Sequence, residues 1–263
     1  MNEKIYNEKE EMLRDILFQL EKEDISQQLI EKIQIICSEK EISTENKEQI
    51  AKMLFQKGYK TEGISILRNI LDDTNTPFFE KDGVPEILSK LGCADESLSA
   101  WLKLIDFIPE NFFLEKTIVR KQIFQNRWEK KIVATLADSN VGVDERKDII
   151  DKLVSIKSFR AISLFLEESE IEIPLFIYAL NALLHPLEEP IGFIYEPNYD
   201  AIIQNEMIKI IQSDLFSIAK RKAAINALHN FTNGDVDLKQ LIQDKGLVPE
   251  LQTFSNSVLN NKL

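Results

Sequence analysis

The sequence predicts an all-α protein built from stacked helical repeats, and three observations support this. Apolar residues recur at steps of three and four along most of the chain, which is the period of an amphipathic helix. The 263 residues include only 8 Gly and 8 Pro, whereas the good helix formers Lys, Glu and Leu are abundant. Several helical segments also share a sequence pattern, which favours repeated units. A generic helical bundle is the alternative.

Four helices are predicted in the N-terminal part of the chain. The first follows the apolar positions of residues 2–20, and the fourth follows those of residues 64–71. The other boundaries are marked by polar caps and a glycine: Asp24 or Ser26 before the second helix, Ser43 or Thr44 before the third, and Gly58 after it. The four helices are predicted to form two acidic hairpins.

The third and fourth helices have the sequence AKMLFQKGYKTEGISILRNIL. The positions of Ala51, Gly58, Gly63 and Leu67 are similar to those of the small and apolar residues in a tetratricopeptide hairpin, although the Trp and the terminal Pro of that family are missing. The turn formers of DDTNTPFFEKDG follow, so we expect a boundary between an N-terminal part at 1–75 and repeats at 76–263. Continuous stacking of the two parts is the alternative.

Four later segments align as related units. They are SLSAWLKLIDF at 97–107, RKDIIDKLVSI at 146–156, a third ending in LNALLHP at 180–186, and RKAAINALHNF at 221–231. A second shared element, GVPEIL at 83–88 and LVPEL at 247–251, predicts helices that begin at a proline, where the missing N–H costs nothing.

Residues 218–254 resemble an armadillo repeat boundary. A helix ending in an Asn-containing apolar segment is followed by a polar loop, a short helix, Gly246 and a helix that begins near Pro249. Residues 79–107 resemble a weaker copy, and residues 128–168 resemble the related HEAT type, so the resemblance covers about 78–260. It implies a right-handed α-solenoid of armadillo/HEAT-like repeats.

The charge balance opposes nucleic-acid binding. The chain has 32 Lys and Arg against 44 Asp and Glu, a net charge of −12, and phosphate neutralisation needs a basic surface. Residues 1–50 hold 13 acids against 7 bases. This stretch would attract a partner with a basic surface, or it is simply a solvated helix face.

Membrane insertion and export are not predicted. The longest run without a charge, residues 173–187, is shorter than the roughly 20 residues that span a bilayer and predicts a buried helix. The N-terminus is acidic and has no apolar signal core. Cys37 and Cys93 are too few for a disulfide framework, so we expect a cytoplasmic location.

Catalytic signatures are missing, and the sequence predicts a protein that is not an enzyme. The two histidines, His185 and His229, have no partners at metal-ligand spacing, and no glycine-rich phosphate loop or nucleophile elbow occurs. We expect no metal and no cofactor. A catalytic Cys dyad or a site assembled from scattered carboxylates is the alternative.

The armadillo resemblance implies a candidate binding face, because that family binds extended peptides through a ladder of Asn side chains in its concave groove. The ladder position falls on Asn230, Asp106, Ser155 and His185. Only one of these is Asn, which argues against recognition of basic nuclear signals. Asp151 and Asn226 lie one turn before Ser155 and Asn230 and share their faces. Ordinary exposed helix residues are the alternative interpretation.

A proline-rich segment, LHPLEEPIGFIYEPNYD at 184–200, provides a second candidate surface. Its three prolines block regular helix. Phe193, Tyr195 and Tyr199 are of the type that anchors interfaces, so the loop 186–199 is predicted to contact a partner. Alternatively, these aromatic rings plug the groove between adjacent units.

The sequence therefore predicts a scaffold that binds another protein through its concave groove and the 186–199 loop. One alternative is an acidic inhibitor or immunity-type protein that masks a basic partner. Another is a chaperone regulator similar to the armadillo nucleotide-exchange factors, an analogy at the level of the fold. The sequence does not identify the partner.

Overall fold

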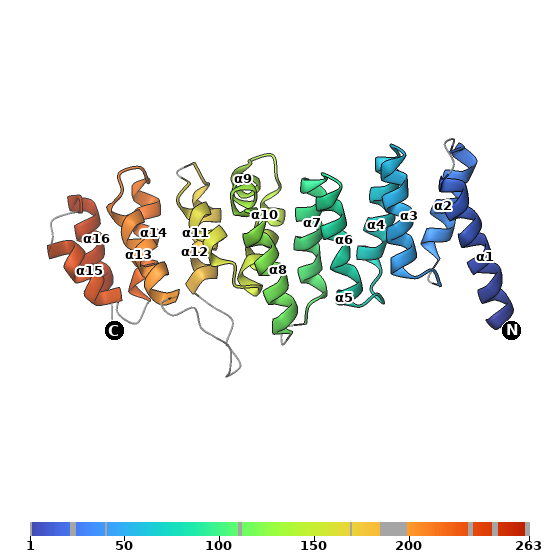
Figure 1. Ribbon diagram of the computed structural model, residues 1–263. Coiled ribbons are helices and arrows are strands. Elements are labelled where there is room, and N and C mark those ends of the chain that lie inside the picture. The colour runs from blue at the N-terminus through green and yellow to red at the C-terminus, as the bar shows by residue number, and fades with distance from the viewer. Residues whose placement is uncertain are drawn as a thin grey trace. The chain divides into compact units, whose positions relative to one another are not determined.

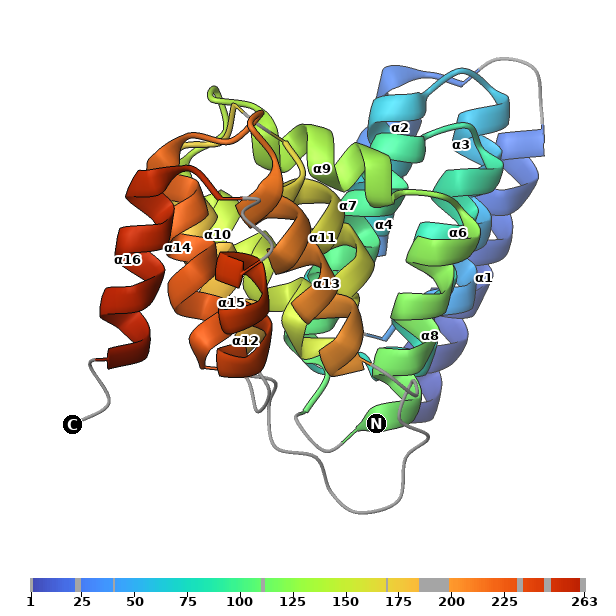
Figure 2. The same cartoon turned by 90° about the vertical axis from the view of Figure 1, so that its left-hand side faces the viewer.

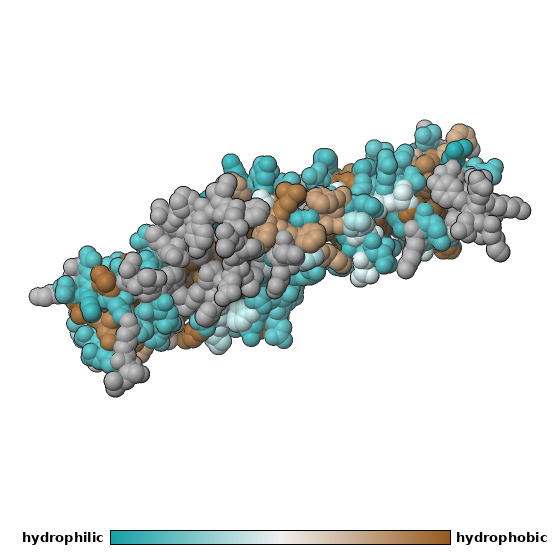
Figure 3. Space-filling model, turned by 90° about the horizontal axis from the view of Figure 1, so that it is seen from below, coloured by the Kyte–Doolittle hydropathy of each residue, from teal (hydrophilic) through white to brown (hydrophobic). Residues whose placement is uncertain are grey.

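The computed structural model describes residues 2–21, 25–39, 41–109, 112–168, 170–184, 199–230, 234–243 and 247–260, with the backbone alone for residues 2–10 and 199–202. Every element in these ranges is a helix (Figure 1). The prediction of an all-α protein is thus confirmed. None of the described helices is both long and apolar enough to cross a membrane. Hydrophilic residues cover much of the face seen in Figure 3.

The chain forms two compact units, Met1–Glu115 and Lys116–Leu263. We call them unit 1 and unit 2 and describe each by itself. The boundary predicted at residues 75 and 76 falls inside unit 1. It stays a prediction about sequence modules.

Unit 1 consists of short helices packed as neighbours along the chain. In it α3 pairs with α4 and α6 with α7, while α1 packs on α3 and α2 on α4. The α6–α7 pair then packs on the α3–α4 pair. The elements are α1 (Asn2–Glu21), α2 (Gln27–Ser38), α3 (Thr44–Gln56), α4 (Lys60–Asp72), α5 (Phe78–Lys81), α6 (Gly83–Lys90), α7 (Ala94–Leu104) and the 3-10 turn η1 (Ile105–Phe107).

Two of the predicted caps begin helices of unit 1. The Ser26 hydroxyl accepts a hydrogen bond from the Leu29 N–H at 3.2 Å and caps α2, and Ser43 caps α3 in the same way. The apolar stripes face inward, where they form the core. Gly63 lets α4 approach α3, because a Cβ at this position would lie 2.6 Å from the Phe55 ring.

A recurring turn joins consecutive helices in both units. After α3, α6, α8 and α10 one residue adopts a left-handed conformation, with φ of 90° at Gly58, 79° at Gly92, 55° at Arg127 and 58° at Lys157. The backbone N–H of this residue donates a hydrogen bond to the carbonyl three residues earlier in the chain. The N–H of the following residue donates to the carbonyl five residues before it. This is the Schellman motif. Successive turns are separated by 34, 35 and 30 residues, a period that suits a helical repeat.

Unit 2 is built around a row of packed helices. In this row α10 packs on α12, α12 on α14 and α14 on α16, and α14 and α16 lie side by side in Figure 2. Helix α11 packs on α9, α10 and α12, and α13 packs on α14. The elements are α8 (Phe113–Gln125), which begins before the unit boundary, α9 (Glu129–Ala137), α10 (Val143–Ser155), α11 (Phe159–Leu166), α12 (Ile173–Leu184), α13 (Tyr199–Gln212), α14 (Ile218–His229), α15 (Gly234–Gln243) and α16 (Pro249–Asn260).

The segments predicted as related units form helices in the structure. The residues aligned at the start of two of them, Arg146 and Arg221, are both buried. Helix α16 begins at Pro249 as predicted, whereas α6 begins at Gly83, two residues before its proline. The uncharged run beginning at residue 173 forms α12, but its burial is one-sided. Ile173 and Ile177 remain 40% and 39% exposed, so the described residues leave part of α12 uncovered.

Candidate functional site

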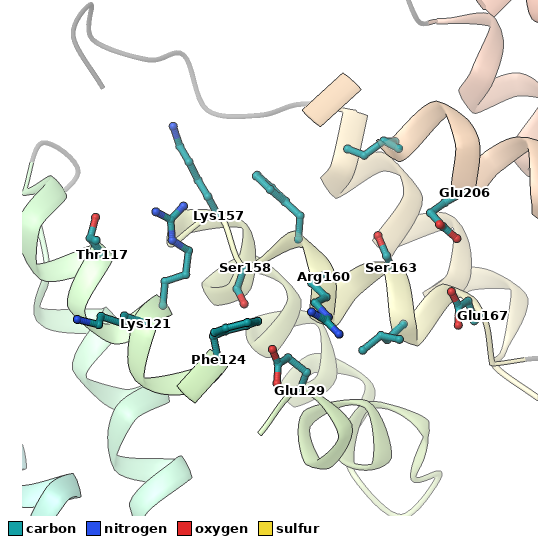
Figure 4. Close-up of a pocket in the computed structure, with 14 residues that line it drawn as sticks. Thr117, Lys121, Phe124, Glu129, Lys157, Ser158, Arg160, Ser163, Glu167 and Glu206 are labelled. Atoms are coloured by element: carbon teal, nitrogen blue, oxygen red, sulfur yellow. The ribbon is translucent and has the colours of Figure 1, made fainter. Parts of the chain in front are cut away.

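A cavity of about 650 Å³ opens on unit 2. We call it the unit-2 groove. Its walls come from α8, from the start of α9, from the turn between α10 and α11, from α11 and from α13 (Figure 4). The residues that line it are Thr117, Arg120, Lys121, Phe124, Glu129, Lys157, Ser158, Phe159, Arg160, Ser163, Leu164, Glu167, Ile203 and Glu206.

One end of the groove is basic. Arg120 and Lys121 come from consecutive positions of α8, and Lys157 comes from the turn before α11. Burial lowers the pKa of Lys157, and the positive charges of Arg120 and Lys116 lower it further. At this end Arg120 and Lys157 therefore repel each other.

The middle of the groove is apolar. The Phe124 ring is 59% exposed, and the Arg160 guanidinium lies 5.7 Å from its centroid, a cation–π distance. Leu164 and the buried Ile203 extend this surface toward α13. An apolar lining beside a few charged groups is typical of binding sites.

The other end of the groove is acidic. In Figure 4, Glu167 and Glu206 lie on the side opposite to Lys121. Partial burial raises the pKa of Glu167, and the neighbouring Glu206 raises it further. Lys209 Nζ lies 2.5 Å from Glu206 Oε1 and offsets part of this negative charge. A further carboxylate, Glu129, lines the groove between the two ends and is only 8% exposed.

The unit-2 groove offers carboxylates, cations and hydroxyl groups. Among its lining residues none is Cys or His. Within the part of the chain that the structure describes, no group of three or more His, Cys, Asp and Glu is placed to hold a metal ion. His229 contacts Asp235, with Nδ1 and Oδ1 2.5 Å apart, away from the groove lining.

The residues predicted for the ladder lie outside the groove lining. Asp106 is an exposed residue of η1 in unit 1. Asp151 accepts a hydrogen bond from the Tyr178 hydroxyl at 2.7 Å, and the Ser155 hydroxyl donates to the Lys152 carbonyl at 2.8 Å.

The remaining ladder positions are on α14 and beyond. Asn226 is exposed on α14 and Asn230 caps its C-terminal end. The ladder positions on α10 and α14 thus belong to the central row of unit 2, whereas α8, α11 and α13 supply most of the groove. Their role in binding stays a prediction. His185, Phe193 and Tyr195 lie outside the described residues, and Tyr199 begins α13.

The groove residues themselves were not predicted. One signal was available, since Arg120-Lys121 and the segment KSFR at 157–160 concentrate basic residues in an acidic chain. Nothing in the sequence indicates that these two segments meet.

Comparison with known proteins gives little guidance. No family model matches the chain, and no curated protein matches it. The chain is similar to one solved structure, human deoxyhypusine hydroxylase in complex with glycerol, with 14% identity, 96% of each chain covered and a TM-score of 0.35.

This comparison corrects the expectation that the protein is not an enzyme. That solved structure is an enzyme by its name, and the expectation is therefore not kept. The likeness assigns no reaction to this chain.

Proposed function

We propose that the protein binds an extended segment of a partner protein in the unit-2 groove. The observation that carries the proposal is the layout of the groove, in which the exposed Phe124 ring and the neighbouring apolar side chains separate a basic end from an acidic end. Aromatic and Arg side chains dominate the energetics of protein interfaces. Phe124 and Arg160 supply both types at the centre.

The size of the groove agrees with this proposal. Its volume of about 650 Å³ lies within the range of binding sites that enclose a ligand. In a groove open to solvent this space holds the side chains of a short peptide stretch, while the rest of the partner stays outside. Charges at both ends would then fix the orientation of that stretch.

We further propose that the repeats form a right-handed α-solenoid of the armadillo/HEAT type in the cytoplasm. The recurring Schellman turns and the successive packing of α10, α12, α14 and α16 support this arrangement. A crystal structure would measure the handedness directly, and a left-handed or closed bundle would overturn this part of the proposal.

Binding in the groove is tested by selecting peptides from a displayed library on the full chain. The selected peptides are then titrated against Leu164→Asp, which places a charge on the apolar surface. Leu215→Asp is the matched control, because Leu215 is 81% exposed and does not line the groove. We expect Leu164→Asp to abolish binding and Leu215→Asp to preserve it, with unchanged circular dichroism in both. Equal binding by both variants would overturn the groove assignment.

The loop 186–199 is proposed as a second contact with the same partner. The proposal depends on the aromatic residues of the loop, because aromatic side chains anchor protein interfaces. Phe193→Ala together with Tyr195→Ala should weaken binding of a full-length partner. Unchanged affinity would remove the loop from the proposal.

The acidic chain suggests a second way of binding, in which it masks a basic partner. The net charge of −12 and the acidic excess of residues 1–50 favour this alternative. The two modes differ in salt dependence: an affinity that depends mainly on the acidic surface would fall steeply with salt, whereas Leu164→Asp would leave it unchanged.

A further inference from the structure

Ser158 stands at the N-cap of a helix but does not cap it. It precedes α11, at the position where Ser26, Ser43 and Ser217 each accept a hydrogen bond from a backbone N–H of their own helix. The Ser158 side chain makes no such bond. The residue is only 8% exposed, and it lines the unit-2 groove. Its hydroxyl is therefore available to a group that enters the groove.

Glu129 is a second buried polar residue of the groove lining. It is the first residue of α9 and is also 8% exposed. Within the part of the chain that the structure describes, its carboxylate forms no hydrogen bond or ion pair. In Figure 4 the Ser158 hydroxyl and the Glu129 carboxylate lie on either side of the Phe124 ring, with Arg160 beside Glu129. An occupant that covers these two polar groups without bonding to them loses affinity.

The charges at this place restrict the chemistry of the occupant. An acidic group is repelled by Glu129, and a basic group is repelled by Arg160. An aliphatic group leaves the Ser158 hydroxyl and the Glu129 carboxylate without partners. A carboxamide avoids all three costs, because it is neutral and carries both donors and an acceptor. Its N–H groups can donate to Glu129, and its carbonyl can accept from Ser158.

We propose that the unit-2 groove recognises a Gln or Asn side chain of the partner segment and holds its carboxamide between Glu129 and Ser158. This inference rests on the proposed function. A neighbouring apolar residue of the segment would pack on Phe124 and Leu164. Selection for the amide would be strong, since a site built to hydrogen-bond a polar group rejects analogues that lack it.

Two variants with matched controls test these contacts. Glu129→Gln keeps the shape of the side chain but replaces one acceptor oxygen with a donor, and it removes the repulsion of acidic groups. Glu250→Gln is its control, because Glu250 is exposed and lies outside the groove lining. Ser158→Ala removes the hydroxyl, and Ser155→Ala does the same outside the lining. Circular dichroism should be unchanged in all four.

The experiment titrates the full chain with four synthetic peptide pools. All share an apolar residue, and they differ at the neighbouring position, which is Gln, Glu, Lys or Met. Met matches the length of Gln without its amide. We expect the wild-type protein to bind the Gln pool at least about tenfold more tightly than the Met pool, as expected for a hydrogen bond to a charged group.

The variants should change this preference in different ways. Glu129→Gln should weaken binding of the Gln pool and strengthen binding of the Glu pool, because the new side-chain amide donates to a carboxylate. Ser158→Ala should weaken binding of the Gln pool about threefold to tenfold, as expected for one neutral hydrogen bond. Glu250→Gln and Ser155→Ala should leave the preference unchanged.

Failure of this inference is distinguishable from failure of the proposed function. If the wild-type protein binds the Gln and Met pools equally, with Leu164→Asp abolishing both, the carboxamide selection is wrong and the proposed groove function stands. A preference for the Glu or the Lys pool overturns the selection as well. If Glu250→Gln shifts the preference as much as Glu129→Gln does, the role of Glu129 is overturned. If no pool binds in a way that Leu164→Asp affects, the proposed function fails together with this inference.

Discussion

The Arg221 guanidinium donates a hydrogen bond from Nε to the backbone carbonyl of Ile211, 2.8 Å away. Ile211 lies near the end of α13, and Arg221 lies in the first turn of α14 with a side chain only 4% exposed. A buried cation thus satisfies a carbonyl at the C-terminal end of the preceding helix, where helix carbonyls have no intrahelical partner. Unit 1 repeats this arrangement, because Lys81 Nζ donates to the Leu71 carbonyl at 3.0 Å across the same ten-residue spacing.

We predict that Arg221→Met lowers the free energy of unfolding by about 2–4 kcal/mol, because it leaves a buried carbonyl without its donor. Lys222→Met is the control, since Lys222 forms an exposed pair with Glu250 and such pairs contribute about 1 kcal/mol or less. Urea denaturation measures both. Equal losses in the two variants would show that the contact with Ile211 does not stabilise the unit.

The left-handed turns lead to a second prediction, which concerns Gly58. Gly58→Ala should cost about 1–2 kcal/mol of stability through the backbone alone, because a Cβ there meets no atom within 4 Å. Gly142 also has open space around it, but its φ of −56° suits any residue. Gly142→Ser should change stability by less than about 0.5 kcal/mol. A neutral effect of Gly58→Ala in thermal denaturation would contradict the strain argument.

The third prediction concerns pH. Burial raises the pKa of Cys37 from 9.0 to about 12, with a smaller opposing effect of Lys47. The folded protein therefore holds this proton more tightly than the unfolded chain. Its contribution to stability is complete below pH 9 and is lost as the pH rises toward 12.

Removal of the thiol tests this assignment. Cys37→Ala should lower stability at neutral pH through the cavity it leaves, and the difference from the wild type should shrink as the pH rises above 9. Guanidinium denaturation at a series of alkaline pH values measures this difference. A constant difference would show that the Cys37 thiol does not titrate in this way.

Local features of the structure were predictable from the sequence. The serine caps of α2 and α3 and the proline start of α16 depend on residues within one turn of each other, so a short stretch of sequence is enough to predict them. The regular period was harder to detect. Two of its turns carry glycine, whereas the other two carry Arg127 and Lys157, which do not signal a left-handed residue.

The sequence by itself determined that this chain is helical, acidic and divided into short amphipathic segments, because periodicity, capping and charge are properties of neighbouring residues. The unit-2 groove was decided by the tertiary structure alone. Arg120, Lys157 and Glu206 are far apart along the chain and line one cavity only because α8, α11 and α13 pack around it. Such proximity follows from the packing of whole helices, which no local pattern encodes.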